Sequence, residues 1–294
     1  MAYSFSLRDP GIEPALRRIA DEVIGTAISG LDQTRPPPTS IHAARKSVKK
    51  LRGLIRLVRP AFSAYDTENA ALRAAGMAIG TLRNAAVMLA VFDSLKDSGE
   101  PDAETMASLR ALFVQRHLHT EDPAALAHSL MTFAEAMREV QTRAAKWQVK
   151  GHGFAALQDG LERTFSAAQK AMRPVIHSPS DPAPDLIHVL RKRVKDHWYQ
   201  CRLLSPIWPE MMDPRCTAAD TLGVLLGDHH DLSELIRLLP QGPASAPLIA
   251  TAIARQRTLL TQALPLSQRL LAGPAHALTA QWQGWWNIWR DQRP

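Results

Sequence analysis

Cysteine is nearly absent from this chain of 294 residues, which contains only Cys201 and Cys216. Two thiols cannot build a disulfide framework or a zinc site with four thiolates. The sequence has no apolar run of about 18 residues or more, so it predicts no transmembrane span. Its first residues lack the basic and apolar regions of a secretory signal. We therefore expect a cytoplasmic protein with reduced thiols, without a metal centre or a cofactor.

Aromatic residues make up only 6% of the chain, and alternating β-branched runs are scarce. Apolar residues instead recur every three or four positions, which is the spacing of a helix with one buried face. Proline and glycine clusters divide the chain into pieces of helical length. Two Pro-rich runs end at Ser40 and Asp185, which are good helix N-caps. The sequence therefore predicts an all-α fold.

One segment of the chain occurs twice. Residues 41–62 and 187–208 align without a gap at an offset of 146 and share nine identities in 22 positions. A weaker similarity places Gly80 opposite Gly227. The chain is therefore predicted to be an internal duplication, with one copy at about 1–149 and the other at about 150–294.

The repeated segment is strongly basic along one side. In the first copy its cationic residues are spaced three or four apart, as neighbours on one helical stripe are. They are His42, Arg45, Lys49, Arg52, Arg56 and Arg59, with Lys46 beside them. The second copy repeats the plan with His188, Arg191, Lys195 and Arg202, and with Lys192 alongside. From residue 33 to residue 65 there is no Asp or Glu.

A uniformly positive stripe points to an anionic partner. Solvated faces normally mix signs, because like charges one turn apart destabilise a helix. The formal net charge of +7 agrees with such a partner. Arginine offers bidentate donors to phosphate and lysine a point charge, so a ligand that repeats phosphate suits the stripe. The two histidines are expected to tighten binding as the pH falls through their usual range.

The doubled motif resembles the CHAD family, the conserved-histidine α-helical domain. The family signature, His-x-x-Arg-basic-x-x-basic, is matched at 42–49 and at 188–195, and residues 226–232 resemble the family pattern of the second half. The resemblance covers the whole chain, 1–294, as a single domain. It implies two four-helix bundles related by an internal pseudo-twofold axis, with the basic helices lining a central groove or pore. It also implies non-catalytic binding of inorganic polyphosphate, often with targeting to polyphosphate granules.

The resemblance also implies which residues bind polyphosphate. They are His42, Arg45, Lys46, Lys49, Arg52, Arg56, His188, Arg191, Lys192, Lys195 and Arg202. Additional cationic candidates are Arg17, Arg18, Arg83, Arg163 and His230. In the second copy Asp196 and Trp198 stand where the first copy has Lys50 and Arg52. The second copy is therefore expected to bind more weakly.

Two other functions stay open. The run His229-His230-Asp231 suggests an HD-type metal phosphohydrolase, but the remaining ligands cannot be placed at a suitable spacing. A basic stripe also attracts nucleic acid, and single-strand binders usually add stacking aromatics. Only Trp198 and Tyr199 lie near the stripes, so nucleic acid is expected only as a competitor.

Four tryptophans near the C-terminus fall on one face of a predicted helix. They are Trp282, Trp285, Trp286 and Trp289. A face of this kind predicts packing against the second copy or a dimer contact.

Overall fold

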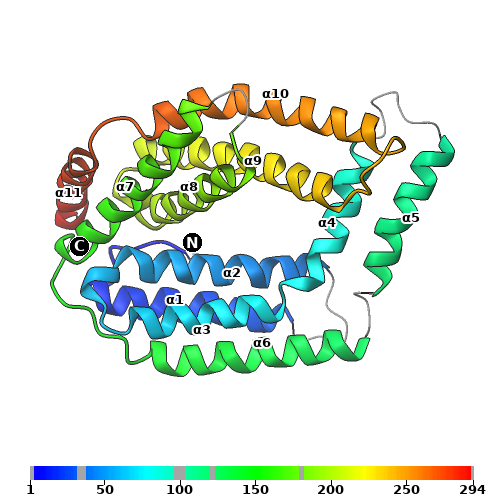
Figure 1. Ribbon diagram of the computed structural model, residues 1–294. Coiled ribbons are helices and arrows are strands. Elements are labelled where there is room, and N and C mark those ends of the chain that lie inside the picture. Colours follow the sequence, from blue (N-terminus) through cyan, green and yellow to red (C-terminus); the bar gives the residue numbers. More distant parts are fainter. Residues whose placement is uncertain (1–2, 32–37, 96–102, 120–122, 179–181, 293–294) are drawn as a thin grey trace.

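The computed structural model describes residues 3–31, 38–95, 103–119, 123–178 and 182–292. All regular structure in these residues is helical, which confirms the all-α prediction (Figure 1). The α-helices are α1 (Ile12–Ser29), α2 (Pro38–Leu57), α3 (Tyr65–Ala78), α4 (Thr81–Asp93), α5 (Ala103–His119), α6 (Pro123–Ala144), α7 (Ala155–His177), α8 (Pro184–Leu204), α9 (Pro209–Leu238), α10 (Ala246–Leu270) and α11 (Ala275–Asp291). Two short 3-10 helices, η1 (Arg59–Ala61) and η3 (Ser205–Ile207), follow α2 and α8.

The helices pack in two groups. In the first, α1 and α3 each contact both α2 and α6. In the second, α8 packs between α7 and α9, and α9 packs against α10. Figure 1 shows the first group in its lower part and the second group above it. The two groups meet where α2 contacts α7 and α8.

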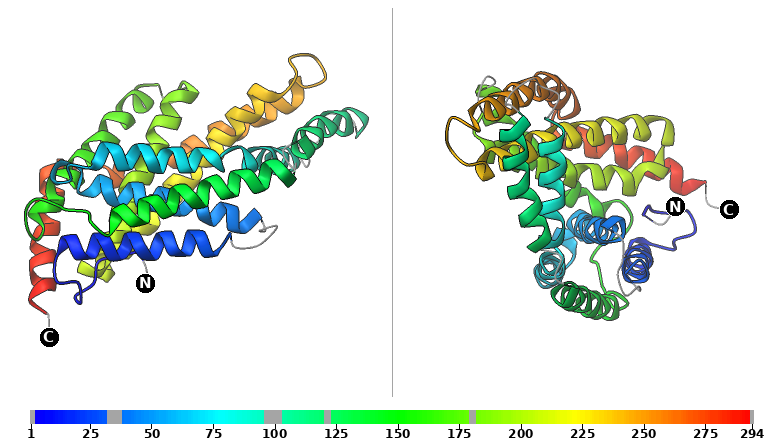
Figure 2. Two further views of the ribbon diagram at one scale, coloured as in Figure 1. Left: turned by 90° about the horizontal axis from the view of Figure 1, so that it is seen from below. Right: turned by 90° about the vertical axis from the view of Figure 1, so that its right-hand side faces the viewer.

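Helices α4 and α5 belong to the first half of the chain, but α4 packs against α9 of the second half, and α5 packs against α4. They extend away from α1, α2 and α3, on the same side as the far ends of α9 and α10 (Figure 2). Phe92 of α4 and Phe113 of α5 lie 5.3 Å apart, measured between ring centroids. Both belong to a separate apolar cluster with Leu232, Leu235 and Leu248. This cluster adds a second connection between the halves.

The basic helices begin at prolines, ahead of the positions that the pattern predicted. Helices α2 and α8 start at Pro38 and Pro184, ahead of the expected N-caps Ser40 and Asp185. Proline suits the first helical turn, where its missing N–H group is not needed. Arg59 lies in η1 and not in α2, so the stripe on the helix ends at Arg56. Pro60 cannot donate the hydrogen bond that would continue the helix.

Two glycines allow the groups to approach closely. A Cβ atom on Gly53 of α2 would lie 2.7 Å from Cβ of Tyr199. A Cβ atom on Gly160 of α7 would lie 1.8 Å from the backbone oxygen of Leu57. No side chain fits at either position, so glycine is required for this contact.

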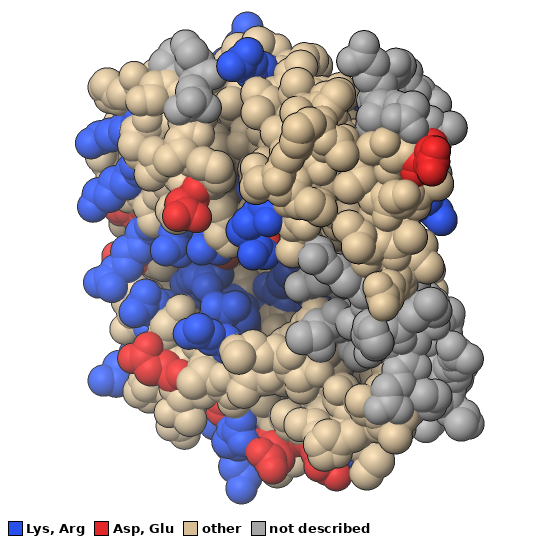
Figure 3. Space-filling view, turned by 45° about the vertical axis from the view of Figure 1, so that its right-hand side comes forward, with Lys and Arg blue, Asp and Glu red and all other residues tan. Residues whose placement is uncertain are grey.

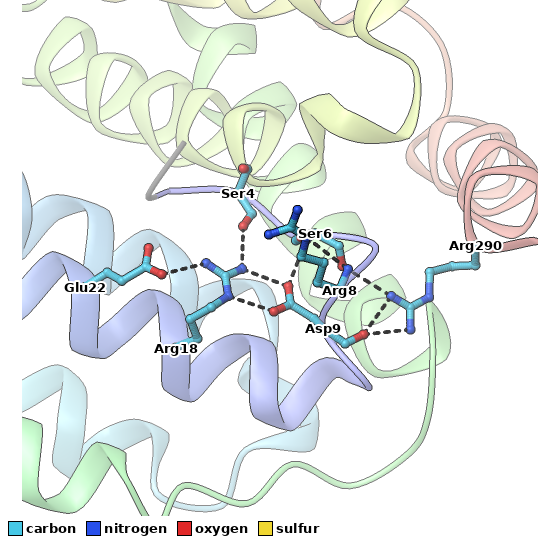
Figure 4. Close-up of polar contacts among 7 residues, drawn as sticks. All are labelled: Ser4, Ser6, Arg8, Asp9, Arg18, Glu22 and Arg290. Atoms are coloured by element: carbon cyan, nitrogen blue, oxygen red, sulfur yellow. Dashed lines mark hydrogen bonds and ion pairs between the residues drawn. The ribbon is translucent and has the colours of Figure 1, made fainter. Parts of the chain in front are cut away.

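The N-terminal segment binds both groups. The Tyr3 hydroxyl donates to the backbone oxygen of Lys50 at 2.8 Å, and the Phe5 amide donates to the backbone oxygen of Leu203 at 3.0 Å. Asp9 accepts two hydrogen bonds from Arg18, and its backbone oxygen accepts from Arg290 of α11 (Figure 4). The segment thereby connects α1, α2, α8 and α11.

The C-terminal tryptophans form a packing face. Helix α11 lies against α7 and η3, with Trp282, Trp286 and Trp289 buried. Trp285 meets Trp208 edge to face, with ring centroids 5.0 Å apart. Of the two alternatives that the sequence left open, the structure shows packing within the chain, against α7 and η3. None of the described helices is long and apolar enough to cross a membrane.

Candidate functional site

The two basic helices bring cations from the two halves of the chain together. Helices α2 and α8 are in contact. Figure 3 shows Lys and Arg side chains gathered around a hollow between the upper and lower parts of the molecule. Most of the cations on α2 and α8 are exposed or half-buried, and Lys46, Lys49 and Lys192 are exposed.

Several of these cations lie over two aromatic rings, those of Trp198 and Tyr3. The ammonium of Lys46 lies 6.0 Å and that of Lys195 4.2 Å from the ring centroid of Trp198. The guanidinium of Arg202 lies 5.1 Å from the same centroid and 5.8 Å from that of Tyr3. Lys50 lies 5.6 Å from the Tyr3 ring. We call Lys46, Lys50 and Arg202 the cation cluster; it joins α2 to α8, with Lys195 at its edge.

The positive charge of the cation cluster is not compensated nearby. Among the described residues, no carboxylate forms an ion pair with Lys46, Lys50 or Arg202. Burial lowers the pKa of Lys50, and the neighbouring charges of Arg202 and Lys46 lower it further. An anion bound beside Lys50 would favour its charged form and act in the opposite direction on this pKa.

Other cations of α2 are held by neighbouring polar groups. Arg45 donates to the backbone oxygens of Ile79, at 3.4 Å, and of Gly80. Arg52 donates to Oδ1 of Asn69 at 3.1 Å, and burial lowers its pKa. These contacts orient the two guanidinium groups without neutralising them.

Arg56 forms an ion pair that connects the halves. It donates to Oδ1 of Asp196 on α8, and Arg193 donates to Oδ2 of the same carboxylate at 3.4 Å. The side chains of Arg56 and Asp196 are each 16% exposed. Burial raises the pKa of Asp196, while the charge of Arg56 acts in the opposite direction. Of the predicted cations, Arg56 is therefore the one most engaged in joining α2 to α8.

The predicted cations of α8 lie against α9. Nζ of Lys195 is 2.8 Å from Oδ1 of Asp220. Arg191 is half-buried beside Gly227, and its Nε is buried with no hydrogen-bond partner among the described residues. Lys192 is exposed. Helix α8 thus presents fewer exposed cations than α2.

His188 and His230 form a close pair. Their ring centroids lie 4.2 Å apart, so the structure brings together two of the predicted histidines. Burial, followed by the charges of His230 and Lys192, lowers the pKa of His188 to about 4. Burial also lowers the pKa of His230. In the free protein, His188 therefore gains its charge only well below pH 6.5, the usual pKa of histidine.

Apart from His230, the additional candidates whose side chains are described lie outside this arrangement. Arg17 is paired with Glu13 at 2.6 Å, and Arg18 is paired with Asp9 and Glu22 (Figure 4). Arg163 is exposed on α7. Arg83 belongs to α4, and its side chain lies outside the described part of the structure.

Comparisons with known proteins agree with the sequence motif. Residues 14–240 match the model of the CHAD domain. The chain belongs to the CHAD domain family. No curated protein matches it. A crystal structure of the CHAD domain from the plant Ricinus communis is similar over 92% of this chain and 94% of that one, with a TM-score of 0.63 and 16% identity. PptA from Streptomyces chartreusis is similar over 85% and 98%, with a TM-score of 0.54 and 15% identity. These likenesses show that this chain has a CHAD-like fold.

Two features of the sequence suggested other functions, a metal phosphohydrolase and a nucleic-acid binder. No group of three His, Cys, Asp or Glu side chains in the described residues could hold a metal ion. His229 is buried, and burial lowers its pKa to about 4. Trp198 and Tyr199 are 6% and 4% exposed, so their faces are covered by protein and not open to a stacking base.

Two residues of this CHAD site were missed from the sequence. Lys50 was missed because it lies beside the predicted stripe. Its spacing of four residues from Lys46 could have indicated a second basic stripe on the same helix. Tyr3 lies 47 residues from its hydrogen-bond partner Lys50, and no local pattern connects the two.

Proposed function

We propose that this CHAD protein binds inorganic polyphosphate between α2 and α8, without catalysing a reaction on it. The observation that carries this proposal is the cation cluster. Two aromatic rings bring Lys46 and Lys50 of one half together with Arg202 of the other. None of these three cations forms an ion pair with a carboxylate among the described residues. Concentrated positive charge of this kind is costly unless an anion neutralises it.

A polymer of phosphates fits the arrangement better than a single anion does. Lys49 of α2 and Lys192 of α8 are exposed beyond the cluster and extend the positive surface along both helices. A chain that repeats a charged group can contact these positions in succession, whereas one phosphate would reach only a few of them. We propose His42, Arg45, Arg52, His188, Arg191 and Lys195 as further contacts, with Arg56 as a link between the halves.

The two groups of helices are, in this proposal, the two bundles of an internal duplication within one domain, related by a pseudo-twofold axis. The 3-10 helices support it, because η1 and η3 span Arg59–Ala61 and Ser205–Ile207, at the same offset of 146 as the sequence repeat. Helices α2 and α8 also begin at equivalent prolines, Pro38 and Pro184. The polyphosphate site would then lie where the two copies meet.

Titration with polyphosphates of defined length tests the proposal. We expect saturable binding whose affinity falls steeply with salt, because neutralising a polyanion releases its counterions. Heparin serves as a control polyanion. Absence of saturable binding at low salt, or equal affinity for heparin, would contradict the proposal.

Competition with RNA separates polyphosphate from nucleic acid. The buried faces of Trp198 and Tyr199 favour a ligand without bases. Long-chain polyphosphate should displace bound RNA, and RNA should not displace polyphosphate at equal phosphate concentration. The opposite order would favour the nucleic-acid function. In cells, we expect a fluorescent fusion of the protein to gather at polyphosphate granules and to disperse when polyphosphate is degraded.

A further inference from the structure

Two glycines four residues apart follow each basic helix along the chain. Gly223 and Gly227 lie inside α9, whereas Gly76 lies in α3 and Gly80 follows its end. The two pairs correspond at an offset of 147. Glycine in a helix is less stable than alanine, so a glycine pair in both copies calls for a structural reason.

In the second copy the glycines lie directly against cations of α8. A Cβ atom on Gly223 would lie 2.8 Å from Cε and 3.1 Å from Nζ of Lys195. A Cβ atom on Gly227 would lie 3.3 Å from Nε and 3.6 Å from Nη2 of Arg191. A larger residue at either position would therefore push the cation away from α9.

The first copy shows a related arrangement. A Cβ atom on Gly76 would lie 3.2 Å from Cγ1 of Val48, so α3 approaches α2 closely there. Arg45, the equivalent of Arg191, donates to the backbone oxygen of Gly80. In both copies, the second glycine of the pair thus meets the arginine of the motif.

The two cations that lie against α9 differ in the partners that they already have. Lys195 is paired with Asp220 and lies over Trp198. Arg191 has a buried Nε without a hydrogen-bond partner among the described residues. Buried donors are normally paired, so the unpaired Nε makes Arg191 the less satisfied of the two cations.

We propose that Gly223 and Gly227 are positioning residues, which seat Lys195 and Arg191 against α9 and so set where these cations meet a polyphosphate chain. This inference rests on the proposed function of the site. The glycines do not touch the ligand and act only through the two cations.

Three alanine variants test the inference: Gly223→Ala, Gly227→Ala and the control Gly25→Ala. Gly25 lies in α1, and a Cβ atom there would meet nothing within 4 Å. Alanine favours the helix at all three positions, and the end of the Lys195 side chain can move aside, so no variant should melt at a lower temperature than the wild type. Gly223→Ala should weaken polyphosphate binding about tenfold, the loss of one charge-assisted contact. Gly227→Ala should weaken it less, and Gly25→Ala should not change it.

The salt dependence of binding distinguishes positioning from a structural defect. A lost phosphate contact should lower the slope of log affinity against log salt by about one, whereas the control should keep the wild-type slope. Wild-type affinity and slope in Gly223→Ala and Gly227→Ala would overturn the inference and leave the proposed function intact. A lower melting temperature with an unchanged slope would also overturn it. If the wild type itself does not bind polyphosphate, both proposals are wrong.

Discussion

The two basic helices carry the same motif but surround it differently. On α2, Lys46 and Lys49 are exposed. On α8, Lys195 is paired with Asp220 and lies over Trp198, and Arg191 is half-buried beside Gly227. The repeated sequence therefore places the same charges on both helices. How exposed each charge is, and whether it is paired, depends on the helix that packs beside it. We expect α2 to supply most of the accessible charge and α8 to supply fewer, more firmly positioned cations.

The contrast is sharpest at two equivalent arginines. Arg56 of α2 is paired with Asp196 of α8. At the equivalent positions of the repeat, Arg202 of α8 and Lys50 of α2 both lie near the Tyr3 ring. One inter-helix contact thus joins opposite charges and the other joins like charges. The first is suited to stability and the second to binding an anion.

Reversing the exposed charge of α2 should have the largest effect. We expect Lys46→Glu/Lys49→Glu to raise the dissociation constant for polyphosphate by about 100-fold or more, because two attractive contacts become repulsive. The helical circular dichroism should not change. Lys170→Glu/Arg173→Glu on α7 is the control, since it makes the same change in charge at exposed positions of a helix outside the repeated motif. An equal loss in the control would show that net charge, and not α2, determines affinity.

Arg56→Met should mainly lower stability. It leaves Asp196 buried without its principal counter-charge, so the free energy of unfolding should fall by about 3 kcal/mol at pH 8. Burial raises the pKa of Asp196 and the charge of Arg56 lowers it, so the pKa should be higher in the variant than in the wild type. Protonation of Asp196 then stabilises the variant more than the wild type at low pH, and this stabilisation is lost as the pH rises through the folded pKa. The loss should therefore be smaller at pH 5.

Urea unfolding at the two pH values checks this prediction, with Arg138→Met, at an exposed position of α6, as the control. The same loss at pH 5 and at pH 8, or a loss as large in the control, would show that the ion pair does not explain the effect.

Arg202→Met should weaken binding without lowering stability, in contrast to Arg56→Met. It removes a cation that faces Lys50, so the free energy of unfolding should not decrease, while polyphosphate affinity should fall about tenfold. Unfolding and binding measured on the same sample separate the two effects. A stability loss equal to that of Arg56→Met would remove the distinction between the two arginines.

The smallest effect is expected from pH. Because the pKa of His188 is lowered to about 4, its ring stays neutral in the free protein, and its contribution to the affinity should be level from pH 8 to about pH 6. A bound polyanion favours the charged ring, so affinity should rise a few-fold as the pH falls further. His188→Gln should lack this rise. A wild-type protein that binds more tightly at pH 6 than at pH 8, through His188, would contradict the pKa shift.

The local pattern was enough to predict the basic helices. The spacing of Arg45, Lys49 and Arg52 depends only on the helical repeat, and α2 and α8 form where this spacing occurs. The helix ends were less accurate, because proline competed with Ser40 and Asp185 for the first turn. CHAD membership also followed from the doubled motif.

Contacts between distant residues could not be predicted in this way. Arg56 and Asp196 are 140 residues apart, and Asp196 read as a mere interruption of the second stripe. Trp198 also read as a gap, although it is the ring around which cations from both halves gather. Periodicity identifies which residues share a face of one helix, but it does not say which helix that face meets.

The stoichiometry of binding tests most directly whether α2 and α8 form one shared site. Calorimetric titration with a short polyphosphate of defined length should give one chain per protein molecule. Either Lys46→Glu/Lys49→Glu or Lys192→Glu/Lys195→Glu should weaken that single event. Two chains per molecule, with each charge reversal removing only one of them, would show that the basic helices bind separately and would contradict the shared site.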